Sequence, residues 1–275
     1  MSTPDPAGPL AQTVIGDPGS PTVVFCHGLL GRGRNFTGIA KALQPDFRCV
    51  LLDMPDHGRS PWTERIDYAT AAALLVEQLE HLAADGPVHL VGHSMGGKTA
   101  MTAALLAPHL VDRLVVVDIS PTGSGEVSEF EHLLGSLLAL DPSAVNSHGQ
   151  ADRELAASVG SPALRGFLLQ NLRRDPGTQT FGWQPNLEVL RRDLPTITGD
   201  IPHEDRTFEG RVLWIAGGES PYITEAHEGP MRALFPRTVQ VTLKGAGHWV
   251  HSEQPEAFTA TLRHFLGGRA ATVRA

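Results

Sequence analysis

Short apolar runs alternate with longer helical patterns along most of this chain, and this alternation restricts its possible folds more than any other feature. The runs are rich in Val, Leu and Ile, and they lack the polar alternation of a half-exposed strand. Such runs are typical of parallel strands that are buried on both faces between layers of helices, in an α/β fold. The predicted strands are 22–26, 47–53, 88–91, 113–118, 211–216 and 239–243, and the predicted helices are 35–43, 68–84, 98–107 and 255–266. Functional residues are therefore expected after the strands, at the carboxyl edge of the sheet.

One region departs from this alternation. Between residues 121 and 206 there is no comparable strand run. Apolar residues recur there at helical spacing in two groups: Phe130, Leu133, Leu134, Leu137 and Leu138, and then Leu164, Phe167, Leu168 and Leu172. We therefore expect a core formed by residues 1–120 and 207–275, and a helical cap formed by residues 121–206. Its position between two strands predicts a lid over an active site.

The charge balance argues against several classes of partner. The 275 residues include 30 acidic and 22 basic ones, and the formal net charge of −8 disfavours binding to nucleic acid or to an anionic membrane surface. No apolar stretch approaches the roughly 18 residues that span a bilayer, and the first residues lack the pattern of a secretory signal. The histidines do not follow the spacing of a zinc site. We expect a cytoplasmic protein that uses no metal or organic cofactor and acts on a small molecule, and the oligomeric state stays open.

The candidate nucleophile is Ser94, in the segment Gly92-His93-Ser94-Met95-Gly96. This segment fits the pattern G-x-S-x-G, directly after a predicted strand and directly before a predicted helix. The pattern needs glycines because side chains at the flanking positions would collide in so tight a turn. The turn presents the serine hydroxyl at the edge of the sheet, and it directs the N–H of Met95 toward developing negative charge. The pattern therefore predicts a nucleophilic serine and one donor of an oxyanion hole.

The same residues also satisfy a second motif. The stretch from Gly92 to Thr99 matches G-x-x-x-x-G-K-[ST], the phosphate-binding loop of nucleotide hydrolases, with Lys98 as its lysine. The apolar run that ends at Asp118 resembles the strand whose aspartate helps to hold magnesium there. Both interpretations predict strand, glycine-rich turn and helix, so the rest of the chain has to decide. In a serine hydrolase, Lys98 would instead be a paired surface lysine or a support behind the site.

Three further segments fit a serine hydrolase and have no role in a nucleotide site. His27-Gly28-Leu29-Leu30 follows an early predicted strand, where the N–H of Leu29 can serve as the second oxyanion donor. Residues 53–60 form a turn after the next strand. His248 lies in Gly245-Ala246-Gly247-His248-Trp249, on the loop after the last predicted strand. We therefore favour Ser94 as nucleophile with His248 as its general base.

Together these segments resemble the α/β-hydrolase superfamily over essentially the whole chain. Within it, the combination of residues 27–31, 53–60, 92–98, 118–121 and 247–249 is similar to the small bacterial esterases of the YbfF type, and mitochondrial abhydrolase-domain relatives share the pattern. The resemblance implies a mostly parallel twisted sheet with helices on both faces and a helical cap inserted after the sixth strand. It also implies hydrolysis of carboxylic esters and sometimes of acyl thioesters.

The acid that supports His248 has two candidates. Many members of the superfamily carry it on the loop after the predicted strand 211–216, but the residue there in this chain is a proline. Asp118, at the end of a predicted core strand, and Glu219, on the glycine-rich loop, remain as candidates. Asp118 is favoured because a residue that ends a rigid strand can hold the histidine better than one on a Gly-Gly loop. Ser220 is expected to hydrogen-bond to the same network.

The expected reaction is acyl transfer to water through an acyl-enzyme, on a carboxylic ester or an acyl thioester with a small or medium acyl group. Perhydrolysis and carbon–carbon bond hydrolysis use the same residue types and stay open as alternatives. His57 and His93 are expected to support the turn after Asp53 and the nucleophile turn. Trp249 is expected either to line the pocket or to pack against the closing helix, and the sequence does not choose between these.

Overall fold

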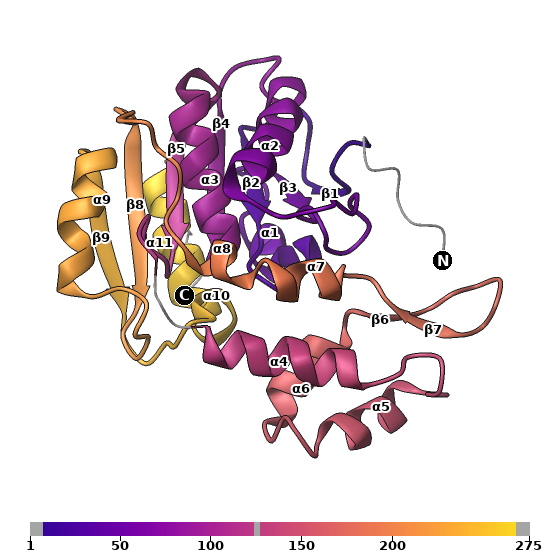
Figure 1. Cartoon of the computed structure of the whole chain (residues 1–275). Coiled ribbons are helices and arrows are strands. Elements are labelled where there is room, and N and C mark those ends of the chain that lie inside the picture. Colours follow the sequence, from indigo (N-terminus) through magenta and orange to yellow (C-terminus); the bar gives the residue numbers. More distant parts are fainter. Residues whose placement is uncertain (1–7, 124–126, 268–275) are drawn as a thin grey trace, which may run out of the picture.

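Seven strands form one sheet in the computed structural model, which describes residues 8–123 and 127–267 (Figure 1). They are β1 (Gln12–Ile15), β2 (Thr22–Cys26), β3 (Arg48–Leu52), β4 (Val88–His93), β5 (Val111–Val117), β8 (Arg211–Gly217) and β9 (Thr238–Leu243). The strand order is β1-β3-β2-β4-β5-β8-β9, and every pairing is parallel except that of β1 with β3. The expected α/β fold is confirmed, and each predicted strand forms within two residues of its predicted bounds. The predicted absence of a secretory signal concerns the first residues, which lie outside the described ranges.

Strand β1 is the strand that the apolar pattern missed. Its four residues alternate between exposed and half-buried positions, and it lies at the edge of the sheet, antiparallel to β3. An edge strand with one solvent-facing side contains no continuous apolar run, so periodicity of the kind seen in β2 to β5 could not reveal it.

Helices of the core cover both faces of the sheet. One face carries the 3-10 helix η1 (Gly33–Phe36) with α1 (Thr37–Ala42), α10 (Val250–Glu253) and α11 (Pro255–Leu266), and the other carries α2 (Tyr68–Leu82), α3 (Met95–Leu106) and α9 (Glu228–Leu234). Two short 3-10 helices, η2 (Pro108–Leu110) and η3 (Glu225–His227), join these elements. Among the described residues, no helix combines the length and the apolar character that a membrane crossing requires.

The central strands contribute to two separate hydrophobic cores because successive side chains point to opposite faces. In β2, Val23 and Phe25 pack in the core beneath α1 and α11, whereas Val24 and Cys26 pack in the core beneath α2 and α3. Both faces of the strand are thus removed from water. This double burial is the physical origin of the continuous apolar runs in the sequence.

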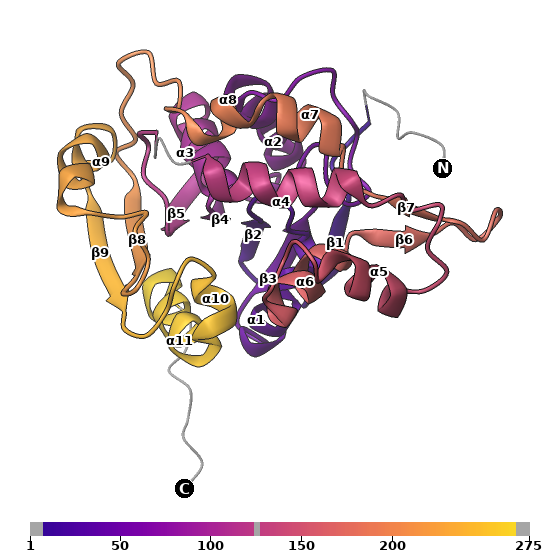
Figure 2. The same cartoon turned by 60° about the horizontal axis from the view of Figure 1, so that its bottom comes forward.

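The described residues between β5 and β8, called the insertion below, lie across the edge at which the parallel strands end (Figures 1 and 2). The insertion contains α4 (Ser128–Ala139), α5 (His148–Leu155), α6 (Pro162–Leu169), β6 (Leu172–Arg174), β7 (Phe181–Trp183), α7 (Leu187–Arg192) and α8 (Leu194–Thr198). The expectation of a purely helical segment missed the antiparallel β6–β7 hairpin, whose strands have only three residues each. The insertion follows β5, the fifth strand of the described chain, where the resemblance implied the sixth, since a single strand precedes β2 in the described residues.

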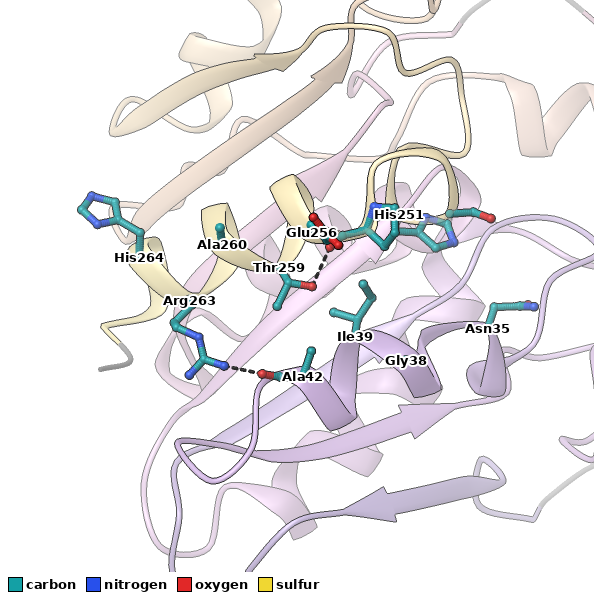
Figure 3. Close-up of a pocket in the computed structure, with 12 residues that line it drawn as sticks. Asn35, Gly38, Ile39, Ala42, His251, Glu256, Thr259, Ala260, Arg263 and His264 are labelled. Carbon is teal, nitrogen blue, oxygen red and sulfur yellow. Dashed lines mark hydrogen bonds between the residues drawn. The ribbon is translucent and has the colours of Figure 1, made fainter. Parts of the chain in front are cut away.

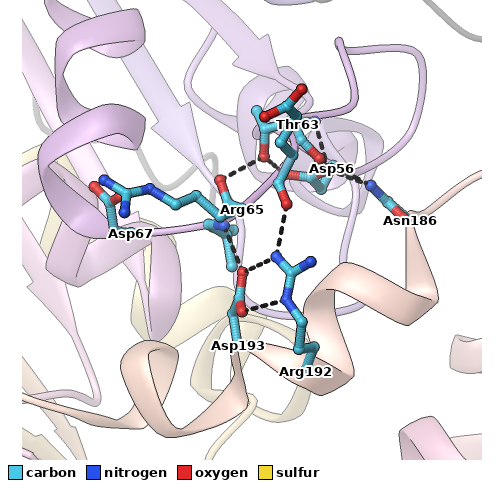
Figure 4. Close-up of polar contacts among 9 residues, drawn as sticks. Asp56, Thr63, Arg65, Asp67, Asn186, Arg192 and Asp193 are labelled. Carbon is cyan, nitrogen blue, oxygen red and sulfur yellow. Dashed lines mark hydrogen bonds and ion pairs between the residues drawn. The ribbon is translucent and has the colours of Figure 1, made fainter.

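A buried polar cluster joins the insertion to the loop after β3 (Figure 4). The carboxylate of Asp56, which is fully buried, accepts hydrogen bonds from Asn186 Nδ2 at 2.9 Å and from Thr63 Oγ1 at 2.6 Å. The backbone carbonyl of Asp56 also accepts a bond from the Asn186 N–H, at 2.9 Å. A buried carboxylate needs such partners, because its desolvation is costly without them. The cluster therefore positions the start of α7 against the core.

Candidate active site

Ser94 occupies a strained turn between β4 and α3. Its backbone angles, φ 52° and ψ −122°, lie outside the regions that residues with a side chain usually adopt. A Cβ at Gly92 would collide with the carbonyl of Gly96, and a Cβ at Gly96 would collide with the carbonyls of Cys26 and His27. Both glycines of the pattern are therefore required by the close approach of the backbone. The turn places the side chain of Ser94 above the carboxyl ends of β2, β4 and β5.

Ser94, His248 and Asp118 form one chain of hydrogen bonds, although the serine and the histidine are 154 positions apart in the sequence. The distance from Ser94 Oγ to His248 Nε2 is 3.0 Å, and the distance from His248 Nδ1 to Asp118 Oδ2 is 2.8 Å. Because Nδ1 faces a carboxylate, it carries the proton, and Nε2 is left to accept from the serine hydroxyl. This arrangement can remove a proton from Ser94 and stabilise the imidazolium that results.

Asp118 lies at the end of β5 and is completely buried. Its Oδ1 accepts a hydrogen bond from the Gly217 N–H at 2.9 Å, and its Oδ2 accepts one from Ser220 Oγ as well as the bond from His248. The side chain of Glu219 is exposed on the neighbouring loop. Of the two candidate acids, the structure thus brings Asp118 to the histidine and not Glu219, and Ser220 joins the network as expected.

Two aromatic side chains hold His248, Tyr222 at the imidazole ring and His93 at the backbone. The ring of Tyr222 stacks on the imidazole, with centroids 4.2 Å apart and an interplanar angle of 28°. On another side, His93 Nε2 donates to the carbonyl oxygen of His248 at 2.8 Å. Burial, with the nearby His248 and His251 as smaller contributions, holds the pKa of His93 well below its usual range, so this ring is neutral. Sequence reasoning gave Tyr222 no role, and its only signal was an aromatic residue two positions after Ser220.

The peptide between Gly28 and Leu29 lies against the serine. A Cβ built on Gly28 would be 3.1 Å from the Cβ of Ser94 and 2.9 Å from Nδ1 of His93. The Gly28 carbonyl accepts from His27 Nδ1 at 2.8 Å, and in a trans peptide the Leu29 N–H points the opposite way. Within residues 8–123 and 127–267, neither the Leu29 N–H nor the Met95 N–H has an acceptor. Two backbone donors beside Ser94 are therefore available to a bound oxyanion.

Neutral histidines hold the loop that carries Leu29. His57 Nε2 accepts from the Leu30 N–H at 3.1 Å, and His27 Nε2 accepts from the Met54 N–H at 2.9 Å. Burial, followed by the neighbouring His57, lowers the pKa of His27 to about 3, and burial also lowers the pKa of His57. Both rings are thus uncharged near neutral pH and can accept these bonds. His57 also donates to the Pro55 carbonyl at 2.8 Å, so it supports the turn after β3 as expected.

Two narrow spaces flank the nucleophile turn. In the space on the side of Leu29, this residue and His93 face Trp249 and Phe167. The ring centroids of Trp249 and Phe167 are 6.0 Å apart, and Phe167 belongs to the insertion. Trp249 therefore lines the pocket, which was one of its two expected positions. The other space lies between Met95 and Ile197 and is almost wholly apolar.

A wider groove of about 780 Å³ lies on the outer face between α1 and α11 (Figure 3). Its lining includes Ile39, Thr259 and Arg263, and it does not include Ser94 or His248. The groove reaches the site only indirectly, through Asn35 and His251, which also line the space on the side of Leu29. The narrow spaces lie nearer the reactive residues, because their linings include the two chain neighbours of Ser94, Met95 in one space and His93 in the other.

Lys98 points away from the glycine-rich turn. Its side chain is 1% exposed, and Nζ donates to the carbonyls of Thr122 at 2.9 Å and of Gly199. The phosphate-loop interpretation is therefore wrong, since it requires this ammonium group at the turn. Of the two positions expected for Lys98 in a hydrolase, at the surface or behind the site, the first is wrong, because the side chain is buried with the rest of α3. In the described part of the chain, no group of three or more His, Cys, Asp or Glu residues is arranged to hold a metal ion.

Comparisons with known proteins agree with this architecture. The family described as "alpha/beta hydrolase fold" matches residues 21–255. The chain is 37% identical over 265 residues to the "sn-1-specific diacylglycerol lipase ABHD11" of Mus musculus, and the aligned region covers 94% of this chain and 85% of the relative. It is 31% identical over 258 residues to "Esterase YbfF" of Escherichia coli strain K12, with 93% and 97% covered. A solved structure, "Marine microorganism esterase", superposes with a TM-score of 0.89 at 31% identity and covers 94% of this chain and 99% of its own. The chain belongs to the alpha/beta hydrolase fold family.

Proposed function

We propose that this protein is a serine hydrolase that cleaves a carboxylic ester, or an acyl thioester, of a small or medium acyl group. The observation that carries the proposal is the hydrogen-bonded chain from Ser94 Oγ through His248 to Asp118, with distances of 3.0 and 2.8 Å. The relatives named as esterases and as a lipase support a carboxylesterase-type hydrolase. The names of these relatives do not agree on one ester, so the size of the acyl group is inferred from the site.

In the proposed reaction, His248 removes the proton of Ser94 while the serine oxygen attacks the substrate carbonyl. The Leu29 and Met95 N–H groups stabilise the oxyanion, and because they are fixed in position they need no reorganisation as charge develops. His248 then protonates the leaving alcohol or thiol, and an acyl-enzyme remains. Water, activated by the same histidine, releases the acid and restores Ser94.

Asp118 is the proposed acid of this triad. Its buried carboxylate holds the imidazole in the tautomer that accepts from Ser94, and it offsets the positive charge that His248 acquires. The Ser220 hydroxyl, which donates to the same carboxylate oxygen, restrains the orientation of Asp118. No metal or organic cofactor enters the scheme.

The insertion is the proposed lid, with residues 121–206 as cap and residues 1–120 and 207–275 as hydrolase core. Phe167 of α6 and Ile197 of α8 come from the insertion and form walls of the two narrow spaces beside Ser94. Ser94 itself is only 6% exposed, so a substrate is largely shielded from bulk water once it has bound. The apolar walls favour an apolar acyl group.

Labelling with a fluorophosphonate, together with turnover of p-nitrophenyl acetate and butyrate, tests the nucleophile. The wild-type protein should be labelled and should hydrolyse both esters. Ser94→Ala should lose labelling and should lose turnover by a factor on the order of 10⁴ or more, because the covalent step has no nucleophile. The exposed Ser143, changed to Ala, serves as the matched control and should behave as wild type.

Circular dichroism should show that Ser94→Ala retains the wild-type fold. Ester turnover or labelling that persists in this variant would show that another group is the nucleophile and would overturn the proposal. Labelling that also disappears in Ser143→Ala would show that the assay reports stability and not chemistry.

A further inference from the structure

Lys98 is a buried cation in the first turns of α3, four residues after Ser94. Among the described residues, no carboxylate lies within ion-pair distance of its Nζ. Lysine is rarely buried so completely without such a partner, because removing an ammonium group from water is costly. The proposed reaction gives this side chain no task.

The partners of Lys98 are the two connections between the core and the insertion. Thr122, whose carbonyl accepts at 2.9 Å, lies where the chain leaves β5 for the insertion. Gly199, whose carbonyl accepts the second bond, directly follows α8, where the chain begins its return to the core. One ammonium group thus holds both connections. The Ile201 N–H donates to the Pro121 carbonyl at 2.9 Å and joins the same two segments a second time.

The surroundings of Lys98 lower the pKa of its ammonium group. Burial lowers the pKa of Lys98 to about 8, and the nearby Asp200 opposes this effect. The ring of Tyr68, from α2, lies 5.9 Å from Nζ and offers a cation–π contact. Near neutral pH the group is therefore charged and donates strongly to the two carbonyls.

The connection at Gly199 is continuous with α8, which forms one wall of the apolar space beside the nucleophile turn. Ile197 and Thr196 of α8 face Met95 and Thr99 of α3 across this space, whose volume is only about 10 Å³. The hydroxyl of Tyr68 donates to the Ile197 carbonyl at 2.5 Å and holds α8 from the side of α2. With α8 in this position, the space accommodates no more than about one water molecule.

We propose that Lys98 is a positioning residue that limits the length of the acyl chain accepted by this site. By holding both connections of the insertion, it keeps α8 against α3 and keeps the apolar space behind Met95 nearly closed. An acyl chain bound to Ser94 is directed toward this space because Met95 is the next residue and the lining is almost wholly apolar. The lining of the space on the opposite side instead mixes His27, His93 and His251 with Leu29, Phe167 and Trp249. The inference rests on the proposed function and adds the feature that selects short acyl groups.

The test compares kcat/KM for p-nitrophenyl acetate, butyrate and octanoate in wild type, Lys98→Met and Lys98→Arg. Wild type should prefer the short esters. Lys98→Met keeps an apolar stem without donors, so the ratio of octanoate to acetate kcat/KM should rise about tenfold, mainly through a lower KM for octanoate. Lys98→Arg retains donors for the two carbonyls and should keep a ratio near that of wild type. Lys41→Met, at an exposed position of α1, is the control for loss of a lysine.

Two variants test the same space without changing Lys98. Ile197→Ala enlarges the wall of α8, and Tyr68→Phe removes the hydrogen bond to the Ile197 carbonyl, so both should raise the ratio of octanoate to acetate. If Lys98→Met does not fold, these two variants decide, and an unchanged ratio in both overturns the inference. A fall of kcat/KM by the same factor for every ester in Lys98→Met, together with a lower Tm, would show that Lys98 only stabilises the fold and would also overturn it.

Failure of the proposed function gives a different result. If the wild-type protein is neither labelled by fluorophosphonate nor active on p-nitrophenyl acetate, the serine mechanism itself is wrong. The wild-type protein could instead be labelled and active while none of the substitutions at Lys98, Ile197 and Tyr68 changes the ratio of octanoate to acetate kcat/KM. That result would overturn only the role of Lys98.

Discussion

The proposed nucleophile and the proposed acid, Ser94 and Asp118, both have an unfavourable backbone conformation. Their φ angles are 52° and 51°, at the ends of the adjacent strands β4 and β5. In each case the backbone N–H donates to the next strand of the sheet, from Ser94 to the Val117 carbonyl at 3.0 Å and from Asp118 to the Ile215 carbonyl at 2.8 Å. Such conformations cost on the order of 1–3 kcal/mol each and persist only where the surroundings enforce them. Here the sheet enforces them and directs both side chains toward His248.

The role of Asp118 is testable at this scale. Asp118→Asn replaces one carboxylate oxygen by an amide group, so His248 loses the acceptor that holds its Nδ1 proton. We expect kcat/KM for p-nitrophenyl acetate to fall by a factor on the order of 10⁴, with the fold retained. The matched change at the rejected candidate, Glu219→Gln, should leave kcat/KM within about twofold of wild type. A large loss in Glu219→Gln with little change in Asp118→Asn would identify Glu219 as the acid.

At the scale of elements, the loop after β2 is held from the core and from the insertion at once. His57 binds the Leu30 N–H from the core, while Asn171, which follows α6, donates from Nδ2 to the Leu30 carbonyl at 2.7 Å. Arg32 Nη1 donates to the carbonyl of Gln170, at 3.0 Å, in the same part of the insertion. The position of the insertion is thus coupled to the geometry of Leu29, the proposed oxyanion donor, because both depend on the same few contacts.

The polar cluster at Asp56 gives a prediction for the attachment of α7. Asn186→Ala removes the Nδ2 donor to the buried Asp56 carboxylate, which then lacks one of its hydrogen bonds (Figure 4). The free energy of unfolding, measured by urea denaturation, should fall by about 1–3 kcal/mol. Glu188→Ala, at an exposed position of the same helix, should change it by less than about 0.5 kcal/mol. Equal stability of the two variants would contradict a structural role for the cluster.

At the scale of the whole molecule, several histidines are buried in the folded state and remain neutral. Burial lowers the pKa of His27 to about 3 and of His251 to about 4, and it also holds that of His93 well below 6.5. In the unfolded chain these side chains titrate near 6.5. Below that pH the unfolded state therefore binds more protons than the folded state, and stability falls as the pH falls. Above that pH both states are neutral at these positions, and they contribute no pH dependence.

The free energy of unfolding should accordingly decrease between pH 6.5 and about pH 4. His251 alone should account for about 3 kcal/mol of this loss at pH 4, given its pKa of about 4. In His251→Leu the decrease over this interval should be smaller by about that amount, as measured by urea denaturation at a series of pH values. Parallel curves for the variant and wild type would show that His251 is protonated in the folded state as readily as in the unfolded one.

Much of this molecule could be predicted from local sequence patterns. Strands β2 to β5, β8 and β9, the strand-to-helix turn at Ser94 and the position of His248 after β9 all follow from patterns within a few residues. Burial on both faces produces an apolar run, and a tight turn requires glycine, so each cause acts on neighbouring positions. Strand β1 and the β6–β7 hairpin leave no such local pattern, because they are short and none of their strands is buried on both faces.

By itself, the sequence determined the α/β architecture, the segments that form the core strands and two of the residues that meet at the site. Only the tertiary structure decided which carboxylate faces His248, that Tyr222 stacks on that ring, and that Lys98 turns from the glycine-rich loop to the connections of the insertion. These contacts join residues that are 24 to 130 positions apart. Their geometry depends on the order in which β4, β5 and β8 pair and on the position of the insertion on α3, and no local periodicity records either one.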